Sequence, residues 1–207
     1  MDKSLLTART RLEDKISLLQ SRTIDIALAW TSKLLARQPR TDFRPRDDDD
    51  AAMLSLLEQL RTPTCTAIVA FLTKVHSLCA TPLAGTGNSV PFFTDLAIGV
   101  RALLFEHFKK FQVSLAGGLM VSKDITRYNE LLRSWPLAPG FAASLELLGE
   151  IGNLFVIGPE ALKERVRGGG AGGALAGLGA ERRELKAYLW KREDAATVGV
   201  QSVLAGL

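Results

Sequence analysis

The sequence predicts an all-α fold, and three patterns along the chain indicate it. Apolar residues recur at intervals of three, four and seven through most of the 207 residues, which is the period of a helix with one buried face. Pro and Gly divide these stretches into segments of helical length. No segment alternates apolar and polar residues for long enough to indicate a strand. With 47% hydrophobic and 23% charged residues, the chain has the composition of a folded protein with a sizeable core.

The first predicted helix is the longest and occupies most of residues 1–37. Its apolar residues follow a helical period, and Pro39 and the polar segment around it end the helix. The apolar residues are Leu5, Leu12, Ile16, Leu19, Ile26, Trp30 and Leu34. Because this face is broad, we expect Leu12, Ile16 and Leu19 to be partly exposed, and we expect self-association or marginal solubility to follow.

Four acidic residues at 47–50 precede the apolar segment 51–60. Acids at this place complement the positive end of a helix dipole. A calcium loop would also need acidic ligands at alternating positions and a Gly for its turn, and that Gly is absent. We therefore interpret the acidic run as the start of a second helix.

Capping residues and prolines mark the next three helices. Thr62 and Pro63 predict the start of a third helix, which ends near Pro82. A fourth helix carries the stripe Phe93, Leu96, Val100, Leu104, His107 and Phe111. The pair Gly117-Gly118 predicts a break, and Ser122 is the expected N-cap of a fifth helix that runs to Trp135.

The C-terminal third of the chain contains further helices around a glycine-rich segment. A sixth helix is expected from about Phe141 to Phe155, and Pro159 begins a short seventh. The residues 168–179 are low in complexity and predict a flexible link. A last helix is expected over 181–194, followed by a tail that docks or frays. The predicted organisation is thus a helical bundle at 1–167, a link at 168–179, and a helix with its tail at 180–207.

Residues able to do chemistry do not form a recognisable site in the sequence. His76 and Cys79 have the spacing of a helical ligand pair, and Cys65 and His107 could complete a zinc site. A structural zinc site usually has two tight ligand pairs, whereas both cysteines here continue an apolar stripe, so we favour core packing. Motifs for acyl transfer, phosphate binding and di-metal chemistry are missing. We expect no enzyme activity, no catalytic residue, no cofactor and no metal.

Basic residues near the middle of the chain form one candidate contact surface. They are Lys109, Lys110, Lys123, Arg127 and Arg133. Such residues could contact anionic lipid or an acidic partner. Asp124 and Glu130 lie among them, so we favour an ordinary solvated face. The net charge of +4 is mild and its basic residues are scattered, which argues against a nucleic-acid partner.

The sequence shows no signal for secretion or membrane insertion, and we expect a cytosolic protein. Residues 1–15 lack the apolar region of a signal peptide, and no apolar run reaches the ~20 residues that span a bilayer. Two cysteines without an N-glycosylation sequon fit a reducing compartment.

Several segments resemble a known family. The segment FEHFKKFQVSLAGGLMVSKDITRYNELLRSW at 105–135 and the segment LELLGEIGNLFVIGPEALKERV at 145–166 resemble the C-terminal region of exocyst complex component 5, the Sec-ten subunit, in its fungal form. The segments 41–50, 60–72 and 186–204 agree with the same family. These are packing and turn signatures without a catalytic residue among them.

The resemblance implies a rod-like module of stacked antiparallel helical bundles, of the CATCHR type found in tethering complexes. It implies a role in the exocyst, which tethers secretory vesicles to the plasma membrane before SNARE-mediated fusion. The partners implied are the other exocyst subunits, especially the Sec-fifteen subunit, with an indirect link to a vesicle Rab GTPase and peripheral contact with the membrane. The implied location is the cytoplasmic side of sites of exocytosis. A recyclin-type F-box protein and an anionic-lipid-binding module remain the alternatives.

Overall fold

The computed structural model describes residues 3–45, 61–167 and 182–207. Within these ranges the chain forms eight helices and no strand. The helices are α1 (Lys3–Ala36), α3 (Pro63–Leu83), α4 (Ser89–Phe108), α5 (Leu115–Arg133), α6 (Phe141–Val156), α7 (Pro159–Arg167), α8 (Arg182–Leu189) and α9 (Val198–Gly206). The predicted all-α fold is confirmed. The segments expected as a second helix at 51–60 and as a glycine-rich link at 168–179 lie outside the described residues.

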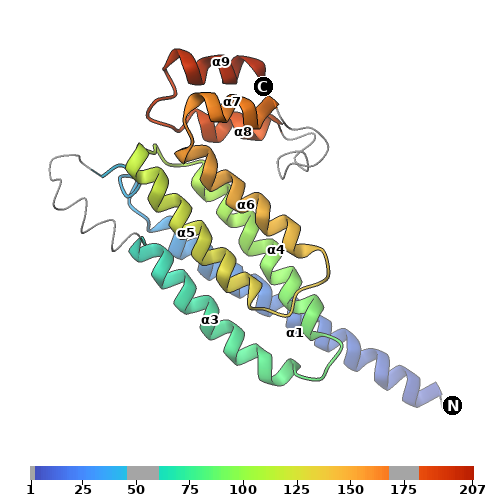
Figure 1. Cartoon of the computed structure of the whole chain (residues 1–207). Helices are drawn as coiled ribbons and strands as arrows, with labels where there is room; N and C mark the ends of the chain where they lie inside the picture. Colours follow the sequence, from blue (N-terminus) through green and yellow to red (C-terminus); the bar gives the residue numbers. More distant parts are fainter. Residues whose placement is uncertain (1–2, 46–60, 168–181) are drawn as a thin grey trace.

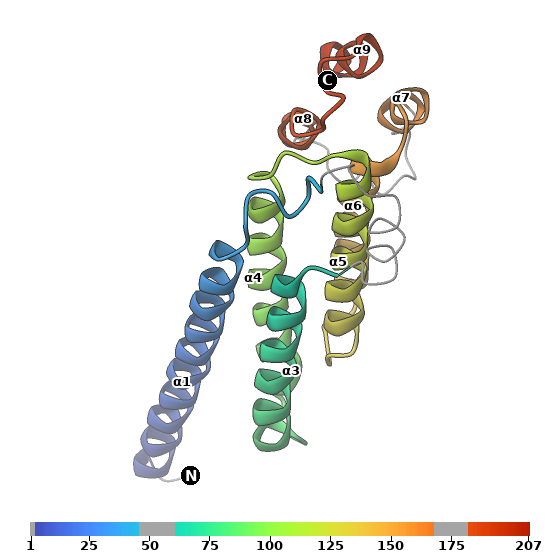
Figure 2. The same cartoon turned by 90° about the vertical axis from the view of Figure 1, so that its left-hand side faces the viewer.

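The long helices α1, α3, α4, α5 and α6 lie side by side as a bundle, and the short helices α7, α8 and α9 gather at one end of it (Figure 1). Both views show α1 along one side of the bundle, with its N-terminal end splayed away from α3 and α4 (Figure 2). At 34 residues and a rise of about 1.5 Å per residue, α1 is roughly 50 Å long. It is therefore much longer than the helices against which it packs.

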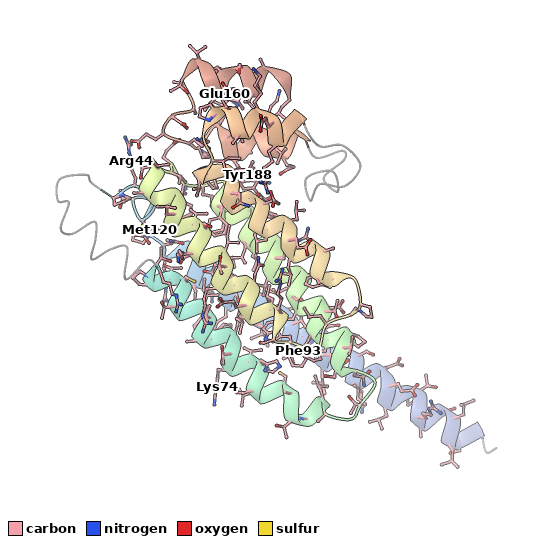
Figure 3. All side chains as sticks on the ribbon, viewed as in Figure 1. Arg44, Lys74, Phe93, Met120, Glu160 and Tyr188 are labelled. Atoms are coloured by element: carbon pink, nitrogen blue, oxygen red, sulfur yellow. The ribbon has the colours of Figure 1, made fainter. Side chains whose placement is uncertain are left out.

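The core runs through the centre of the bundle and continues into the C-terminal helices. The stripe predicted for the fourth helix is buried as expected, although α4 ends at Phe108 and Phe111 follows it. The stripe of α6 is buried from Leu145 to Phe155. Phe93 points into the bundle, whereas Lys74 on α3 points into solvent (Figure 3). The burial of one face of each helix agrees with the amphipathic period of the sequence.

Helix α3 starts as the sequence predicts. Thr62 is its N-cap, and the hydroxyl of Thr62 accepts a hydrogen bond from the backbone N–H of Cys65 at 3.0 Å. Contrary to the expectation for the sequence, α3 is long and apolar enough to cross a membrane by length and composition alone. Cys65, Ile68, Val69 and Leu72 form the buried face of α3, whereas only 17% of its most apolar stretch is buried in the structure.

The predicted start of the fifth helix is wrong. Helix α5 begins after Ser114, whose hydroxyl accepts from the N–H of Gly117 at 3.1 Å, and Gly117 and Gly118 lie inside its first turns. The two glycines allow other backbone segments to approach α5 closely. A Cβ at Gly117 would lie 1.7 Å from the carbonyl oxygen of Phe43, and one at Gly118 would lie 2.6 Å from that of Phe155.

The predicted end of the last helix at residue 194 is also wrong. Helix α8 ends at Leu189, and the chain then pairs with Val113: the Val113 N–H donates to Lys191 O at 2.8 Å and the Glu193 N–H donates to Val113 O at 2.9 Å. Arg192 is buried at this turn. Its guanidinium donates to the carbonyl oxygens of Leu154 and Ile157, at 2.5 and 2.8 Å, and caps the end of α6.

The C-terminal tail docks on the rest of the chain. Residues 198–206 form α9, which packs against α7 and α8, and Val200, Val203 and Leu204 are buried. Of the residues expected on the last helix, Leu185, Tyr188 and Leu189 are buried, whereas Trp190 follows the helix and is exposed. The tail therefore belongs to the folded core.

We expect Gly117→Ala to lower the free energy of unfolding by at least ~2 kcal/mol, because the new methyl group would overlap the rigid backbone at Phe43. Gly149→Ala on α6 is the matched control. The nearest atom there is Asn129 Nδ2 at 3.8 Å, so the higher helix propensity of Ala should stabilise this variant by up to ~1 kcal/mol. Urea unfolding followed by circular dichroism measures both effects. Equal stability of Gly117→Ala and the parent chain would contradict the close approach.

Candidate interaction surface

The residues considered for a metal site do not come together. Cys65 and Cys79 both lie on α3 as free thiols, and the His76 ring packs against Phe93 and Trp135 with centroids 4.8 and 5.9 Å apart. The ring of His107 instead contacts Gln38. Among the described residues, no three His, Cys, Asp or Glu side chains are placed to hold a metal ion.

Asp124 is a buried carboxylate, although the charged residues around it in the sequence predict a solvated face. Only 1% of its surface is exposed, and it accepts hydrogen bonds from the N–H and hydroxyl of Thr62 at 3.0 and 2.6 Å. Burial raises the pKa of Asp124 to about 6, although the hydrogen bonds from Thr62 oppose this. Asp124 lies within the buried stripe formed by Val121, Ile125 and Tyr128 on α5, a spacing from which its burial could have been predicted. It fixes the start of α3 to α5.

His107 is the second buried polar group that holds helices together. Its Nε2 lies 2.6 Å from Oε1 of Gln38, which follows the end of α1. Burial, with smaller contributions from Lys110 and Arg40, lowers the pKa of His107 to about 4. The ring is therefore neutral at neutral pH. A neutral ring bonded to Gln38 stabilises the packing of α1 on α4, as expected for a core histidine.

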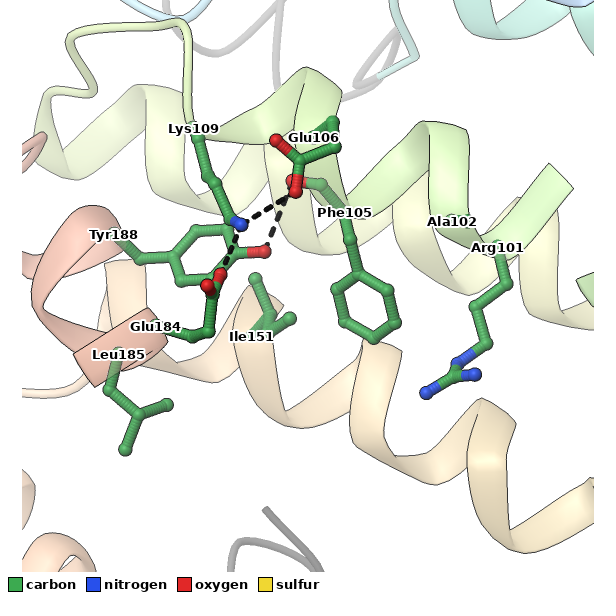
Figure 4. A pocket seen from close by; sticks show the side chains of 9 residues that line it. All are labelled: Arg101, Ala102, Phe105, Glu106, Lys109, Ile151, Glu184, Leu185 and Tyr188. Atoms are coloured by element: carbon green, nitrogen blue, oxygen red, sulfur yellow. Dashed lines mark hydrogen bonds and ion pairs between the residues drawn. The ribbon is translucent and has the colours of Figure 1, made fainter. Parts of the chain in front are cut away.

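Lys109 lies beside a cavity of about 330 Å³ between α4, α6 and α8 (Figure 4). Its ammonium group forms ion pairs with Glu106 at 2.7 Å and with Glu184. The hydroxyl of Tyr188 donates to the carbonyl oxygen of Phe105 at 3.1 Å. These contacts join the C-terminal helices to the bundle and largely neutralise Lys109.

The other four basic residues of the predicted contact surface differ in their surroundings. Arg127 pairs with Glu130 at 3.0 Å on α5. Lys110, Lys123 and Arg133 are exposed, and within the described ranges none of them forms an ion pair. Lys110 follows the end of α4, whereas Lys123, Arg127 and Arg133 lie along α5. Three of the five cations are therefore accessible, on two different segments of the chain.

Helix α1 uses a different face for the core from the one that the sequence suggested. Ala27, Thr31 and Leu35 are buried against α3 and α4, and the hydroxyl of Thr31 donates to the carbonyl oxygen of Ala27 at 2.8 Å. Ile24 and Leu28 pack against the core beside them, and Leu28 lies against Gly99 of α4. The larger apolar residues predicted as the helix stripe lie on an adjacent face, and only Leu34 among them packs against the core.

That adjacent face is exposed to solvent. We call it the outer stripe, and it consists of Leu5, Leu12, Ile16, Leu19, Ile26 and Trp30. The exposed fraction is 60% for Leu12, 65% for Leu19 and 71% for Ile26, so the expected exposure of Leu12, Ile16 and Leu19 is confirmed. Exposed apolar residues in a continuous stripe are typical of a surface that contacts another macromolecule.

The C-terminal part of the outer stripe forms one wall of an apolar groove. Ile26 and Trp30 of α1 face Phe71, Val75 and Leu78 of α3 across a volume of about 670 Å³. Lys33 lies at the end of the groove, with its ammonium 5.3 Å from the centre of the Trp30 ring. The hydrogen bonds of Asp124 to Thr62 fix the N-terminus of α3 and thereby position this wall. The groove and the outer stripe are the candidate interaction surface.

Comparisons with known proteins agree on one family. A family model described as "Exocyst complex component Sec10-like, alpha-helical bundle" matches residues 3–204. The chain is 31% identical over 182 residues to exocyst complex component 5 of Oryza sativa subsp. japonica, covering 87% of this chain and 21% of that protein. It is 29% identical over 184 residues to exocyst complex component SEC10 of Saccharomyces cerevisiae, covering 89% and 19%. Human exocyst complex component 5 is 23% identical over 155 residues, covering 74% and 21%. The chain thus spans about a fifth of the length of these relatives.

We expect Asp124→Asn to change how the stability of the chain depends on pH. The raised pKa means that between about pH 4 and pH 6 the unfolded chain loses this proton more readily than the folded chain. The contribution of Asp124 to the free energy of unfolding is therefore largest below pH 4, and it falls by on the order of 3 kcal/mol as the pH rises through 6.

His107 acts in the opposite direction, because its lowered pKa stabilises the fold above pH 6.5 and the effect is lost toward pH 4. The measurement is therefore the difference between the parent chain and Asp124→Asn in urea unfolding from pH 4.5 to 7.5. Asn can still accept the Thr62 N–H, and the parent should lose stability relative to it as the pH rises. Parallel curves for the two proteins would refute the assignment.

Proposed function

This chain belongs to the Sec10-like family of exocyst complex components, and from this membership we propose that it is part of a non-enzymatic tethering subunit. Its role is to help hold secretory vesicles at the plasma membrane before SNARE-mediated fusion. It acts through contacts between helices and other proteins. The observation that carries the proposal is the family match over residues 3–204, which includes nearly every described residue.

The surface of the chain supports a role in protein contact. The outer stripe exposes six large apolar side chains along one helix, and burying such side chains in a partner is favourable by roughly 25 cal/mol per Å² of apolar surface. Among the buried polar groups, Asp124, His107 and Arg192 hold helices together in the ways described above. A scaffold subunit needs a stable bundle and an accessible contact face, and both are present.

The proposed partners are the other exocyst subunits, with the Sec-fifteen subunit as the nearest neighbour and an indirect link to a vesicle Rab GTPase. The proposed location is the cytoplasmic side of sites of exocytosis. The exocyst names of the relatives favour this proposal over a recyclin-type F-box protein. We retain the boundaries 1–167, 168–179 and 180–207 as the proposed division into bundle, link and C-terminal unit.

Direct contact with anionic lipid is the second candidate function, and the exposed cations Lys110, Lys123 and Arg133 favour it. Each accessible cation near an anionic surface contributes about 1 kcal/mol. Replacing all three with Glu should lower flotation with phosphatidylserine vesicles at least tenfold. Lys74→Glu, an exposed change on α3, is the control and should have little effect. Flotation unchanged by the triple substitution would remove lipid binding through this surface.

We expect the chain, tagged and purified from its native cells under mild salt, to recover exocyst subunits. Quantitative mass spectrometry should find these subunits, including the Sec-fifteen subunit, enriched at least tenfold over a tagged unrelated helical protein. The Gly117→Ala variant should recover less of them because its bundle is destabilised. Recovery of the intact chain without any exocyst subunit would contradict the proposed function.

A further inference from the structure

The outer stripe of α1 has the spacing of a coiled-coil seam. Leu5, Leu12, Leu19 and Ile26 follow one another at intervals of seven, and Ile16, Thr23 and Trp30 form a second series at the same interval. The two series together recur every 3.5 residues on average, which keeps one face of a helix against a partner helix over several turns. All these side chains are exposed, so the bundle itself does not use the seam.

The groove between α1 and α3 continues this seam on a concave surface. A helix laid along Leu5 to Leu19 would contact α1 alone, and farther along it would enter the groove between Trp30 and Val75. Helices pack with their axes 8–10 Å apart, and the lining of Phe71, Val75 and Leu78 supplies an apolar second wall. The occupant favoured by this shape is a helix with its own apolar stripe.

One edge of the outer stripe is basic. At 100° per residue, Arg11, Lys15, Arg22 and Lys33 all project to the same side of the stripe, the side away from the buried residues Thr31 and Leu35. All four are exposed, and in the described part of the chain none forms an ion pair. A partner helix would complement this edge with acidic residues.

We propose that the outer stripe of α1 binds an amphipathic helix of another subunit, and that this helix carries acidic residues beside its apolar stripe. The proposal rests on the proposed scaffold function, because it assigns the contact with a neighbouring subunit to a particular face. The apolar side chains supply most of the binding energy. Arg11, Lys15, Arg22 and Lys33 select an acidic partner and exclude a basic one.

A second copy of this chain fits the seam poorly. In a parallel pair, Arg9 lies in the seam opposite Arg9 of the other copy. In an antiparallel pair, Lys15 and Arg22 face one another across the same edge. Neither arrangement gives Lys15 or Arg22 an acidic neighbour, and like charges at flanking positions disfavour pairing. The charges thus oppose the self-association that the exposed stripe alone predicts.

A membrane surface also fits less well than a helix. A helix that lies in a bilayer interface has a broad apolar face with basic residues on its polar face. Here Asp14 and Asp25 lie just beyond the basic edge, where they would meet lipid phosphates. The concave groove with α3 also follows the shape of a helix and would leave a flat bilayer out of contact with Val75.

Two designed peptides of about four heptads test the proposal. Both carry Ile and Leu at the seam positions. One has Glu and the other Lys at the flanking positions, which also prevents each peptide from pairing with itself. We expect fluorescence anisotropy with the purified chain to give at least tenfold tighter binding for the Glu peptide, with the preference weakening as salt is added.

Variants at exposed positions link the binding to α1 without disturbing the fold. Leu12→Glu with Leu19→Glu should weaken binding of the Glu peptide at least tenfold. Lys15→Glu with Arg22→Glu should reverse the preference between the two peptides. The control Leu115→Glu with Val198→Glu changes apolar side chains outside α1 that are at least as exposed, and it should bind as the parent does. Melting followed by circular dichroism confirms that each variant is folded.

Several results would overturn the proposal. Equal binding of the two peptides would refute the role of the basic edge. If neither peptide binds and the chain forms a dimer that depends on Leu12 and Leu19, the stripe binds a second copy. If neither peptide binds and flotation with phosphatidylcholine–phosphatidylserine vesicles depends on these two residues, the stripe binds lipid. In the purified native complex, Lys15 should cross-link to a helix of another subunit. Cross-links confined to this chain would refute the assignment of the bound helix to another subunit. If the peptides do not bind but exocyst subunits are recovered normally, only the proposed binding role of the outer stripe is rejected. If the peptides bind but no exocyst subunit is recovered, only the proposed function is rejected.

Discussion

The direct approach of backbone to backbone at the start of α5 is the constraint on which the rest of the structure depends. Gly117 admits the carbonyl group of Phe43, and Gly118 admits that of Phe155. The first contact holds the segment that follows α1, and the second holds the end of α6. Three distant parts of the chain are thus fixed at one point. Arg192 closes the same end by bonding the last carbonyls of α6, so the C-terminal helices are positioned by this junction.

Much of the fold follows from local sequence signals. The period of apolar residues locates α1, α3, α4 and α6, and Thr62 with Pro63 marks the start of α3, because these signals act within a few residues. The predictions are wrong where contacts with distant residues determine the ends of a helix. A glycine pair usually ends a helix, but here the approach of Phe43 and Phe155 requires glycine inside one. The turn after Leu189 depends on Val113, which is far away in the sequence, and local patterns contain no sign of it.

The candidate surface could be predicted only in part. The apolar residues of α1 are evident from the sequence, and the exposure of Leu12, Ile16 and Leu19 was expected. The sequence does not reveal which of two apolar faces of α1 the bundle buries, and the structure buries the one with Ala27, Thr31 and Leu35. The choice depends on contacts with distant residues, such as that of Leu28 with Gly99 of α4, which local patterns do not contain. For Asp124, the neighbouring cations suggested solvent, although its spacing from Val121 and Ile125 indicates the core.

The length of α1 has a mechanical consequence. The helix contains neither Gly nor Pro between Lys3 and Ala36, so it lacks the usual points at which helices bend sharply. Its C-terminal half is anchored by Ala27, Thr31 and Leu35, while its N-terminal half stands clear of α3 and α4 (Figure 2). Because α1 is stiff, a force on its N-terminal half would turn the helix about its anchored C-terminal half. Force applied to the N-terminal half would therefore reach the bundle as torque.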